Sequence, residues 1–317
     1  MFISKGSQKK ALFMCSVIAI TIYLLISSTI LVTKNGDSSL QLDNSLKNNA
    51  FSIIQITDTQ ILSMQNSWKN LTKWISSQKS NYNIKMVVHT GDIVNDGGDV
   101  KQWENANKSM SILTENGIPY CWSVGNHDII KSTQGACIGK EYKSFNTTTM
   151  QSKSYWLSDF DGKNTAVNFT FGNYSFVIIN LEFLANSTVI AWMQNIIEAH
   201  EKSNVIIATH SYLNSSGGYG WHGYGNGWEL KFKSILDGYS NVFLTLSGHD
   251  IDGTAYHSRI GNREEIFFNR QGINACCARL LTFNMENHSI SVQTYLAYSG
   301  DWLNDSDNKF SFDAVLR

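Results

Sequence analysis

The chain has 317 residues, 42% of them hydrophobic, and a formal net charge of −1 at pH 7. This length and hydrophobic content are sufficient for one large α/β domain with a buried core. A nearly neutral chain without a clustered Lys/Arg face lacks the electrostatic surface of nucleic-acid binders, so we expect no nucleic-acid partner.

Residues 11–32, with the sequence ALFMCSVIAITIYLLISSTILV, contain no charged side chain. As a helix this stretch would span roughly 33 Å at 1.5 Å per residue, which matches the thickness of a bilayer core. Lys5, Lys9 and Lys10 precede it without any acidic residue. The positive-inside rule therefore predicts that residues 1–10 stay in the cytoplasm and that the rest of the chain lies outside.

A cleaved signal peptide is the alternative interpretation of this segment. Its apolar region is usually about 7–15 residues long and ends at a cleavage site of small residues. Residues 11–32 fit neither feature. We therefore expect an uncleaved signal anchor, a single pass through the cell membrane, with the folded domain on the extracytoplasmic side.

Residues 33–50 are polar and weakly patterned, which is typical of a linker, so the folded domain is predicted to cover residues 51–317. Several N-x-S/T triplets would accept glycans in an exported glycoprotein, although a chain this rich in Asn, Ser and Thr contains many by chance. Cys121, Cys137, Cys276 and Cys277 would permit up to two disulfides, whose pairing the sequence does not give. We favour inert structural roles for them.

From residue 51 onward, short β-rich runs alternate with amphipathic helical segments. The predicted strands are 51–57, 84–90, 120–124, 174–181, 204–210 and 241–247. Apolar residues recur at helical spacing in 68–75, 103–113 and 192–197. Beyond Gly253 we expect short strands only, including 279–285 and 289–295. This order predicts two packed sheets flanked by helices.

Polar clusters follow the predicted strands. In chain order they are ITDTQ with Asp58 and Gln60, TGDIVN with Asp92 and Asn95, VGNHD with Asn126, His127 and Asp128, ATH with His210, and SGH with His249. Ligand sites in α/β layers gather beyond the carboxyl ends of strands. These side chains are all candidate metal ligands, or neighbours of one, so we expect them to form a single metal site.

This succession of motifs resembles the calcineurin-like metallophosphoesterase family, whose pattern runs D-x-H or D-x-Q, G-D-x-x-D/N, G-N-H-D/E, H and G-H-x-H. The resemblance covers residue 51 to the C-terminus. It implies an α/β fold, the calcineurin-like four-layer sandwich of two mixed β-sheets flanked by helices. In this chain the predicted transmembrane helix would precede that domain.

The resemblance also implies two divalent metal ions of the Mn, Fe or Zn class and a small-molecule phosphoester substrate. A hydroxide shared by the two ions would attack phosphorus, and Asp92 would bridge them. The first ion would be held by Asp58 and Gln60. The second would be held by Asn126, His210 and His249. Gly91, Gly125 and Gly248 would permit the tight turns between strand and site.

By the same resemblance, His127 is not a metal ligand but faces the phosphate. An imidazolium there would protonate the leaving oxygen as a general acid. Asp128 is expected to orient it. Asn95 is expected to form a hydrogen bond near the ligands, and His89, on a buried strand, to be structural.

Two positions depart from the family pattern. Gln60 stands where His is commoner, and its amide oxygen can still ligate. Ile251 stands where the second His of G-H-x-H serves the first metal, and isoleucine cannot coordinate. Asp250 or Asp252 could replace it. The alternative to a hydrolase is a non-catalytic or weakly active metal-binding cell-surface protein whose first metal site is degenerate.

Residues 217–228, GGYGWHGYGNGW, combine glycines with aromatic side chains directly after His210. Such a segment could cover the site and stack on an aromatic leaving group. A solvated surface loop is the competing interpretation. The sequence does not distinguish a monoester, diester, nucleotide or lipid substrate.

Overall fold

The computed structural model describes residues 49–65, 67–130, 136–220, 227–251, 254–271 and 276–317. The predicted cytoplasmic segment 1–10, the predicted transmembrane segment 11–32 and nearly all of the predicted linker lie outside these residues. Within the described ranges, no helix is long and apolar enough to cross a membrane. The membrane anchor therefore stays a prediction.

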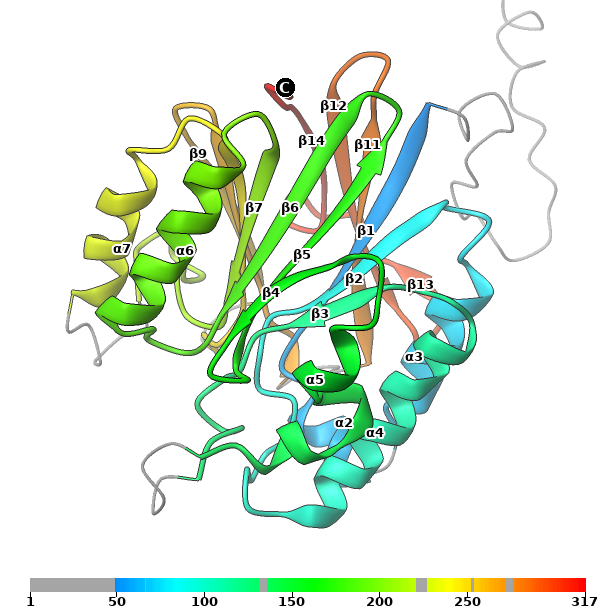
Figure 1. Cartoon of the computed structure of the whole chain (residues 1–317). Helices are drawn as coiled ribbons and strands as arrows, with labels where there is room; N and C mark the ends of the chain where they lie inside the picture. Colours follow the sequence, from blue (N-terminus) through cyan, green and yellow to red (C-terminus); the bar gives the residue numbers. More distant parts are fainter. Residues whose placement is uncertain (1–48, 66, 131–135, 221–226, 252–253, 272–275) are drawn as a thin grey trace, which may run out of the picture. The chain divides into compact units, whose positions relative to one another are not determined.

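The first sheet is built around three parallel strands, β1 (Ala50–Ile56), β2 (Ile84–His89) and β3 (Tyr120–Trp122). On the other side of β1, the antiparallel strands β11 (Cys277–Asn284) and β12 (Ser289–Leu296) extend the sheet. The short strands β13 (Asp301–Trp302) and β14 (Lys309–Asp313) both pair with β12. Figure 1 shows that strands from the two ends of the domain lie side by side in this sheet.

The second sheet has the order β4-β5-β6-β7-β8-β10-β9. Its strands are β4 (Trp156–Phe160), β5 (Asn164–Phe171), β6 (Tyr174–Leu181), β7 (Asn204–Thr209), β8 (Val242–Ser247), β9 (Ala255–Ile260) and β10 (Arg263–Phe268). Strands β6, β7, β8 and β10 are parallel to one another, whereas β5 and β9 run antiparallel to their neighbours. Both sheets are therefore mixed, as predicted.

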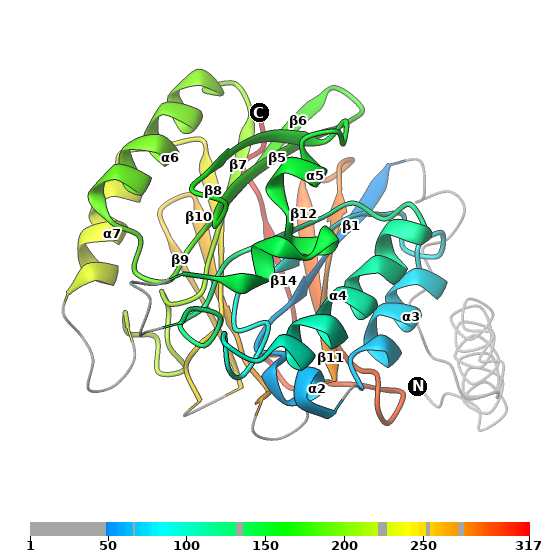
Figure 2. The ribbon, with the colours of Figure 1, turned by 60° about the horizontal axis from the view of Figure 1, so that its bottom comes forward.

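Helices cover the outer face of each sheet (Figures 1 and 2). Against the first sheet lie α2 (Gln60–Gln65), α3 (Lys69–Ser77) and α4 (Val100–Glu115). Against the second lie α6 (Ser187–Ala199) and α7 (Trp228–Leu236). The short helices η2 (Ile138–Glu141), η3 (Lys143–Phe145) and α5 (Thr147–Met150) connect β3 to β4.

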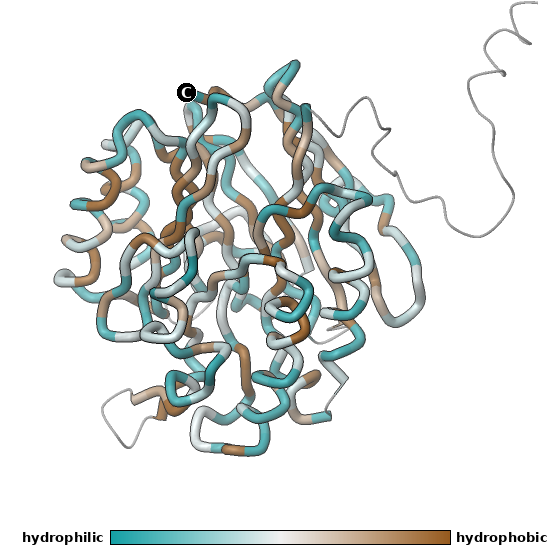
Figure 3. Tube along the Cα trace, turned by 45° about the vertical axis from the view of Figure 1, so that its right-hand side comes forward, coloured by the Kyte–Doolittle hydropathy of each residue, from teal (hydrophilic) through white to brown (hydrophobic). Residues whose placement is uncertain are grey.

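Three apolar clusters correspond to the three interfaces between these layers. Trp68 and Trp103 are buried between the helices and the first sheet, and Met193 and Phe232 between the second sheet and its helices. Phe51 lies between the sheets, where its ring contacts that of Phe176 in β6 at 5.1 Å between centroids. Figure 3 shows that apolar residues, in brown, recur along the strands and helices of the domain. The predicted four layers are confirmed.

The predicted strands agree with the structure to within two residues, and β6 agrees at both ends, whereas α4 and α6 begin three and five residues before the predicted segments 103–113 and 192–197. Strands β4 and β5 were not predicted, because polar and aromatic residues interrupt their apolar pattern and every residue of β4 is only half-buried. The four cysteines are buried thiols. This agrees with inert packing roles rather than with disulfide bonds, and burial raises the pKa of Cys121 to about 12.

Candidate metal centre

The carboxyl ends of parallel strands from both sheets meet at one edge of the domain, and main-chain hydrogen bonds join them. The Asp58 N–H after β1 donates to the Gly91 carbonyl after β2 at 3.0 Å. The Gly248 N–H after β8 donates to the His210 carbonyl after β7 at 3.0 Å. The Phe183 N–H, after β6 in the second sheet, donates to Val124 after β3 in the first at 2.8 Å.

Three of the predicted ligands have left-handed backbone conformations. The φ angles are 50° at Asp58, 52° at Asp92 and 78° at His249. This region is unfavourable for residues with a Cβ and costs on the order of 1–3 kcal/mol per residue. Such outliers persist where the surrounding structure imposes them, and they concentrate at functional sites.

Glycines next to these residues leave the room that the carboxylates need. A Cβ at Gly125 would collide with the carboxylate and main-chain nitrogen of Asp92. A Cβ at Gly248 would collide with Thr57 and with the carboxylate of Asp58. The two glycines thus permit the close approach of neighbouring strand ends, as the sequence predicted.

The buried carboxylate of Asp92 is the central group. Its Oδ1 accepts from the His127 N–H at 3.0 Å and lies 3.2 Å from His210 Nε2. Its Oδ2 accepts from Gln60 Nε2 at 2.7 Å. Burial would raise the pKa of Asp92, but the charge and hydrogen bond of His210 outweigh burial and hold it below the ordinary value.

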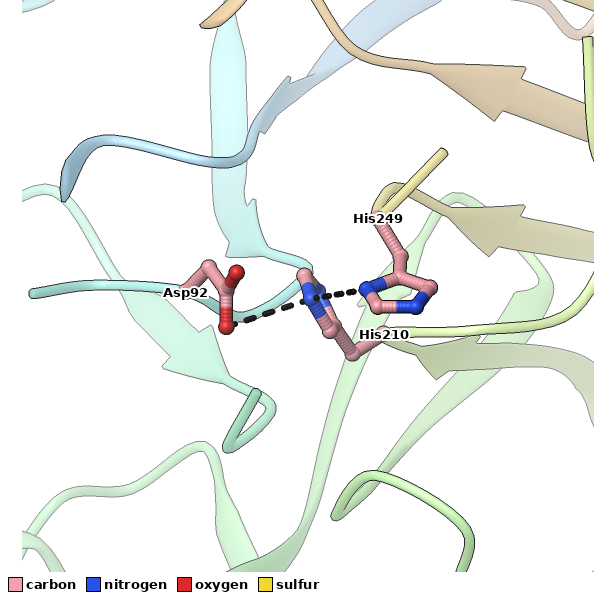
Figure 4. A group of neighbouring side chains, drawn as sticks. All are labelled: Asp92, His210 and His249. Atoms are coloured by element: carbon pink, nitrogen blue, oxygen red, sulfur yellow. Dashed lines mark hydrogen bonds and ion pairs between the residues drawn. The ribbon is translucent and has the colours of Figure 1, made fainter. Parts of the chain in front are cut away.

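His210 and His249 complete a compact cluster with Asp92, in which the three candidate ligand atoms lie within 4.8 Å of one another. Nδ1 of His210 donates to the Thr90 carbonyl at 2.9 Å, which directs Nε2 toward Asp92 and toward His249 Nδ1 at 3.1 Å (Figure 4). A main-chain carbonyl that accepts from one ring nitrogen in this way fixes the tautomer of a metal-binding histidine.

The pKa values of the two imidazoles are shifted in opposite directions. Burial opposes the charged form of His210, but Asp92 and Asp58 together raise its pKa to about 9. Burial and the charge of His210 lower the pKa of His249 to about 3. His210 is therefore the proton donor of the pair, and His249 accepts from it through Nδ1.

Three of the predicted ligands carry a buried oxygen that has no hydrogen-bond partner in the part of the chain that the structure describes. These atoms are Asp58 Oδ1, Gln60 Oε1 and Asn126 Oδ1. A buried acceptor without a partner costs roughly 1–3 kcal/mol. Carboxylate and amide oxygens beside two imidazoles are a donor set that suits divalent cations. The residues present therefore fit such ions.

Asp58 is a buried acid whose two carboxylate oxygens differ in their contacts. Its Oδ2 accepts from the Thr57 hydroxyl at 2.5 Å and from the His249 N–H at 3.2 Å. Burial raises its pKa to about 7, with His210 lowering it and Asp92 raising it further. A carboxyl group buried so deeply beside another acid is stabilised in its charged form by a cation.

His127 is held by a group that the sequence did not identify. Its Nδ1 donates to the main-chain carbonyl of Asn95 at 2.8 Å, which leaves Nε2 as the ring nitrogen for other partners. His127 lines a cavity of about 440 Å³ together with Asn95, Asp96, Gly97, Asn126, Ile129 and Ile130. Asn95 thus acts through its backbone, beside the ligands.

The orienting role predicted for Asp128 is wrong. Its Oδ1 accepts from the Val94 N–H at 2.9 Å and its Oδ2 from the Gly125 N–H at 2.7 Å. Both carboxylate oxygens are thus engaged by the backbone of the two loops that carry Asp92 and Asn126. Burial and the charge of Asp92 raise the pKa of Asp128 to about 8. Asp128 shapes the turn that presents His127, rather than the imidazole itself.

A family model for the calcineurin-like phosphoesterase matches residues 51–253. The chain belongs to the calcineurin-like phosphoesterase family.

A curated relative, the uncharacterized protein YvnB of Bacillus subtilis (strain 168), is 29% identical to the chain over 273 residues. The match covers 79% of this chain and 20% of the relative, so the chain spans about one fifth of the length of the curated relative it matches.

Two solved structures share the calcineurin-like fold at low sequence identity. GAP50, the anchor in the inner membrane complex of Plasmodium, has a TM-score of 0.54 at 14% identity, over 84% of this chain and 89% of GAP50. The purple acid phosphatase PPD1 from yellow lupin (Lupinus luteus) seeds has a TM-score of 0.53 at 13% identity, over 84% of this chain and 54% of PPD1. At such identities the likeness shows the fold alone.

The departure from the calcineurin-like pattern at Ile251 is visible in the structure. The Ile251 side chain is 62% exposed. The preceding residue, Asp250, accepts through Oδ2 from both the N–H and the hydroxyl of Ser215, each at 2.8 Å. This anchors the chain after His249 against the loop that follows β7. Asp252, the other predicted substitute, lies outside the described residues.

One residue at the site was missed altogether. Gln271, in the segment after β10, accepts a hydrogen bond from Gln60 Nε2 at 3.2 Å through its Oε1. No motif marks Gln271 in the sequence. Its only signal is its place shortly after a strand that ends at the same edge as β8.

His89, on the buried strand β2, is held by hydrogen bonds at both ring nitrogens. His89 is fully buried, its Nδ1 accepts from the Gly91 N–H at 3.1 Å, and its Nε2 donates to Thr59 at 2.9 Å, so its structural role is confirmed. Burial, with His210 nearby, lowers the pKa of His89 to about 3.

The centre of the predicted lid, 221–226, lies outside the described residues, and its flanking Tyr219 donates to Glu265 at 2.7 Å.

Binding of a divalent cation at pH 7 is expected to release at least about one proton. His210, with a pKa near 9, carries a proton that a metal ligand must lose, and Asp58, near 7, is partly protonated as well. Affinity should consequently fall as the pH is lowered below 9. Isothermal titration calorimetry with Mn²⁺ in buffers of different ionisation enthalpy measures the number of protons. His210→Asn should lower it, and a buffer-independent enthalpy would contradict the assignment.

Proposed function

We propose that this calcineurin-like protein hydrolyses phosphoric esters with two divalent cations. The observation that carries the proposal is a set of buried ligand oxygens, on Asp58, Gln60 and Asn126, that lack hydrogen-bond partners among the residues the structure describes and are gathered around one carboxylate. When bound, the two cations would activate water and neutralise the charge that develops on the phosphoryl group.

The two sides of Asp92 suit a bridging role. Oδ2 faces Gln60, which we assign with Asp58 to the first cation. Oδ1 faces His210, which we assign with Asn126 and His249 to the second. Each oxygen lies beside a different group of candidate ligands, and these contacts support the predicted division of the site.

We assign the general-acid role to His127. Its backbone N–H donates to Asp92, which fixes the residue beside the cations, and the Asn95 carbonyl holds Nδ1. The remaining ring nitrogen, Nε2, is then the atom that donates a proton to the leaving oxygen. Such a donor typically contributes about 10²–10⁴ to the rate.

The cavity that His127 lines is the proposed place for the leaving group. Asn95, Asn126, Ile129 and Ile130 line it as well. The described residues that line it include the acid Asp96 and neither Lys nor Arg. The site is therefore better suited to a small alcohol or phenol than to a leaving group that carries further phosphates.

One observation favours a second candidate, a metal-binding protein of the cell surface with little or no turnover. Ile251, where the family places a histidine for the first cation, is exposed and cannot coordinate. A first position with Asp58, Gln60 and the shared Asp92 alone would fill weakly, and the protein would then hold one cation.

We also propose that residues 11–32 anchor the domain in the cell membrane, with the site on the extracytoplasmic side. The support is the length of the uncharged segment and the Lys residues before it.

His127→Ala is expected to lower kcat for the hydrolysis of alkyl phosphates by about 10²–10⁴-fold. Alkyl phosphates have poor leaving groups, whose oxygen needs a proton as it departs. Hydrolysis of 4-nitrophenyl phosphate should fall less than about 10-fold, since its leaving group needs little protonation. The matched control is His200→Ala, a half-buried histidine whose Nδ1 also bonds to a main-chain carbonyl. Equal losses on both substrates, or normal turnover of the alkyl ester, would remove the acid role.

Metal content and turnover measured on one sample separate the enzyme from the metal-binding alternative. We expect about two Mn²⁺ per chain after equilibrium dialysis, with hydrolysis of 4-nitrophenyl phosphate that is lost on chelation. About one Mn²⁺ per chain without hydrolysis, across a full Mn²⁺ titration, would favour the binding protein instead.

The anchor is tested in cells with a C-terminal tag. The full chain should stay in the membrane fraction after carbonate extraction, with the tag accessible to protease from outside. A chain that starts at residue 49 should lose the membrane association. If cells that express the full chain released a shortened product into the medium, the cleaved signal peptide would be favoured.

A further inference from the structure

The segment after β10 lies at the metal centre. Because β10 is parallel to β8, both strands end at the same edge of the second sheet, and β8 leads into His249. Asn269 directly follows β10 and is buried. Its N–H donates to the Thr254 carbonyl at 2.9 Å, and its Oδ1 accepts from the Gln271 N–H at 2.8 Å. These bonds fix the backbone at Gln271.

The side chain of Gln271 reaches the group that serves the first cation. Nε2 of Gln60 donates both to Asp92 Oδ2 at 2.7 Å and to Gln271 Oε1 at 3.2 Å. This NH₂ group therefore lies between two oxygen acceptors, while Gln60 Oε1 is buried and has no hydrogen-bond partner within the described ranges. The arrangement has the oxygens of a cation site, with an amide NH₂ among them.

The two ends of the Gln60 amide have nearly the same shape, so a half-turn of the amide exchanges oxygen and nitrogen with little movement. After that turn Oε1 would face the oxygens of Asp92 and Gln271. Three oxygens facing one another repel unless a cation lies among them. A cation and this turn of Gln60 therefore go together.

We propose that Gln271 is a ligand of the first cation through its Oε1. With Asp58, Gln60 and the shared Asp92, it forms a four-oxygen set in place of the histidine that the chain lacks at Ile251. This inference rests on the proposed two-cation function.

The proposal gives the two positions different chemistry. An all-oxygen set suits hard cations such as Mg²⁺, Mn²⁺ or Ca²⁺. The second position, with His210 and His249, also suits Zn²⁺ and Fe²⁺. The first position should therefore select Mn²⁺ over Zn²⁺ more strongly than a histidine-containing site does.

The test measures Mn²⁺ binding to the full chain by equilibrium dialysis with elemental analysis. Wild type should bind two equivalents. Gln271→Ala should keep one equivalent at wild-type affinity and bind the other at least about 10-fold more weakly. The retained site reports that the variant is folded. The matched control is Gln194→Ala on α6, a half-buried glutamine whose amide donates to Tyr239, and it should bind as wild type does.

A second variant separates a ligand from a residue that merely positions Gln60. Gln271→His offers a nitrogen donor, so the preference of the first position for Zn²⁺ over Mn²⁺ should rise at least about 10-fold. A positioning role would leave this preference unchanged, and that result would overturn the proposal.

The failures are distinguishable. Two equivalents bound by Gln271→Ala at wild-type affinity would overturn the inference and leave the proposed function standing. One equivalent bound by the wild type would overturn both the inference and the two-cation function.

Discussion

The buried carboxylate of Asp92 is the group on which the arrangement of this edge depends. It accepts from Gln60 after β1, from the backbone of His127 after β3, and from His210 after β7. A charged carboxylate inside a protein requires such donors, because burial without them costs several kcal/mol. Satisfying one acid thus brings loops of both sheets to the same place.

The rest of the domain supplies the rigidity that this edge needs. Asp58, Asp92 and His249 hold left-handed backbone conformations that isolated loops would leave. Each lies within three residues of the end of a strand in a packed sheet, and aromatic contacts such as that of Phe51 in β1 with Phe176 in β6 join the sheets face to face. Close-packed layers are hardly compressible, so the left-handed conformations are retained where the ligands are needed.

Much of this could be predicted because the determining features are local in sequence. A buried strand followed by Asp or His marks a ligand at the carboxyl end, and five such endings in one order indicate the family. Glycine positions were equally readable, since Gly125 and Gly248 must approach carboxylates closely. Strands β4 and β5 lack a clean apolar alternation and escaped prediction.

What could not be predicted are contacts made by backbone atoms or by loops without a motif. The partner of His127 is the main-chain carbonyl of Asn95. Because every residue has a carbonyl, the sequence does not mark this one, and the adjacent acid Asp128 is the partner that sequence analysis favours. Asp128 was assigned to His127 for that reason, although it serves two backbone amides. Gln271 approaches Gln60 across the fold, from a position 211 residues further along the chain.

The same contacts explain why the missing histidine at 251 need not leave the first position incomplete. Asp250 is anchored to Ser215, and the residue after it is turned to solvent. The neighbouring loop after β10 approaches from the same edge and offers an amide oxygen to Gln60. A ligand lost from one strand end can thus be replaced from the next strand of the sheet, because parallel strands deliver their successors to a common edge.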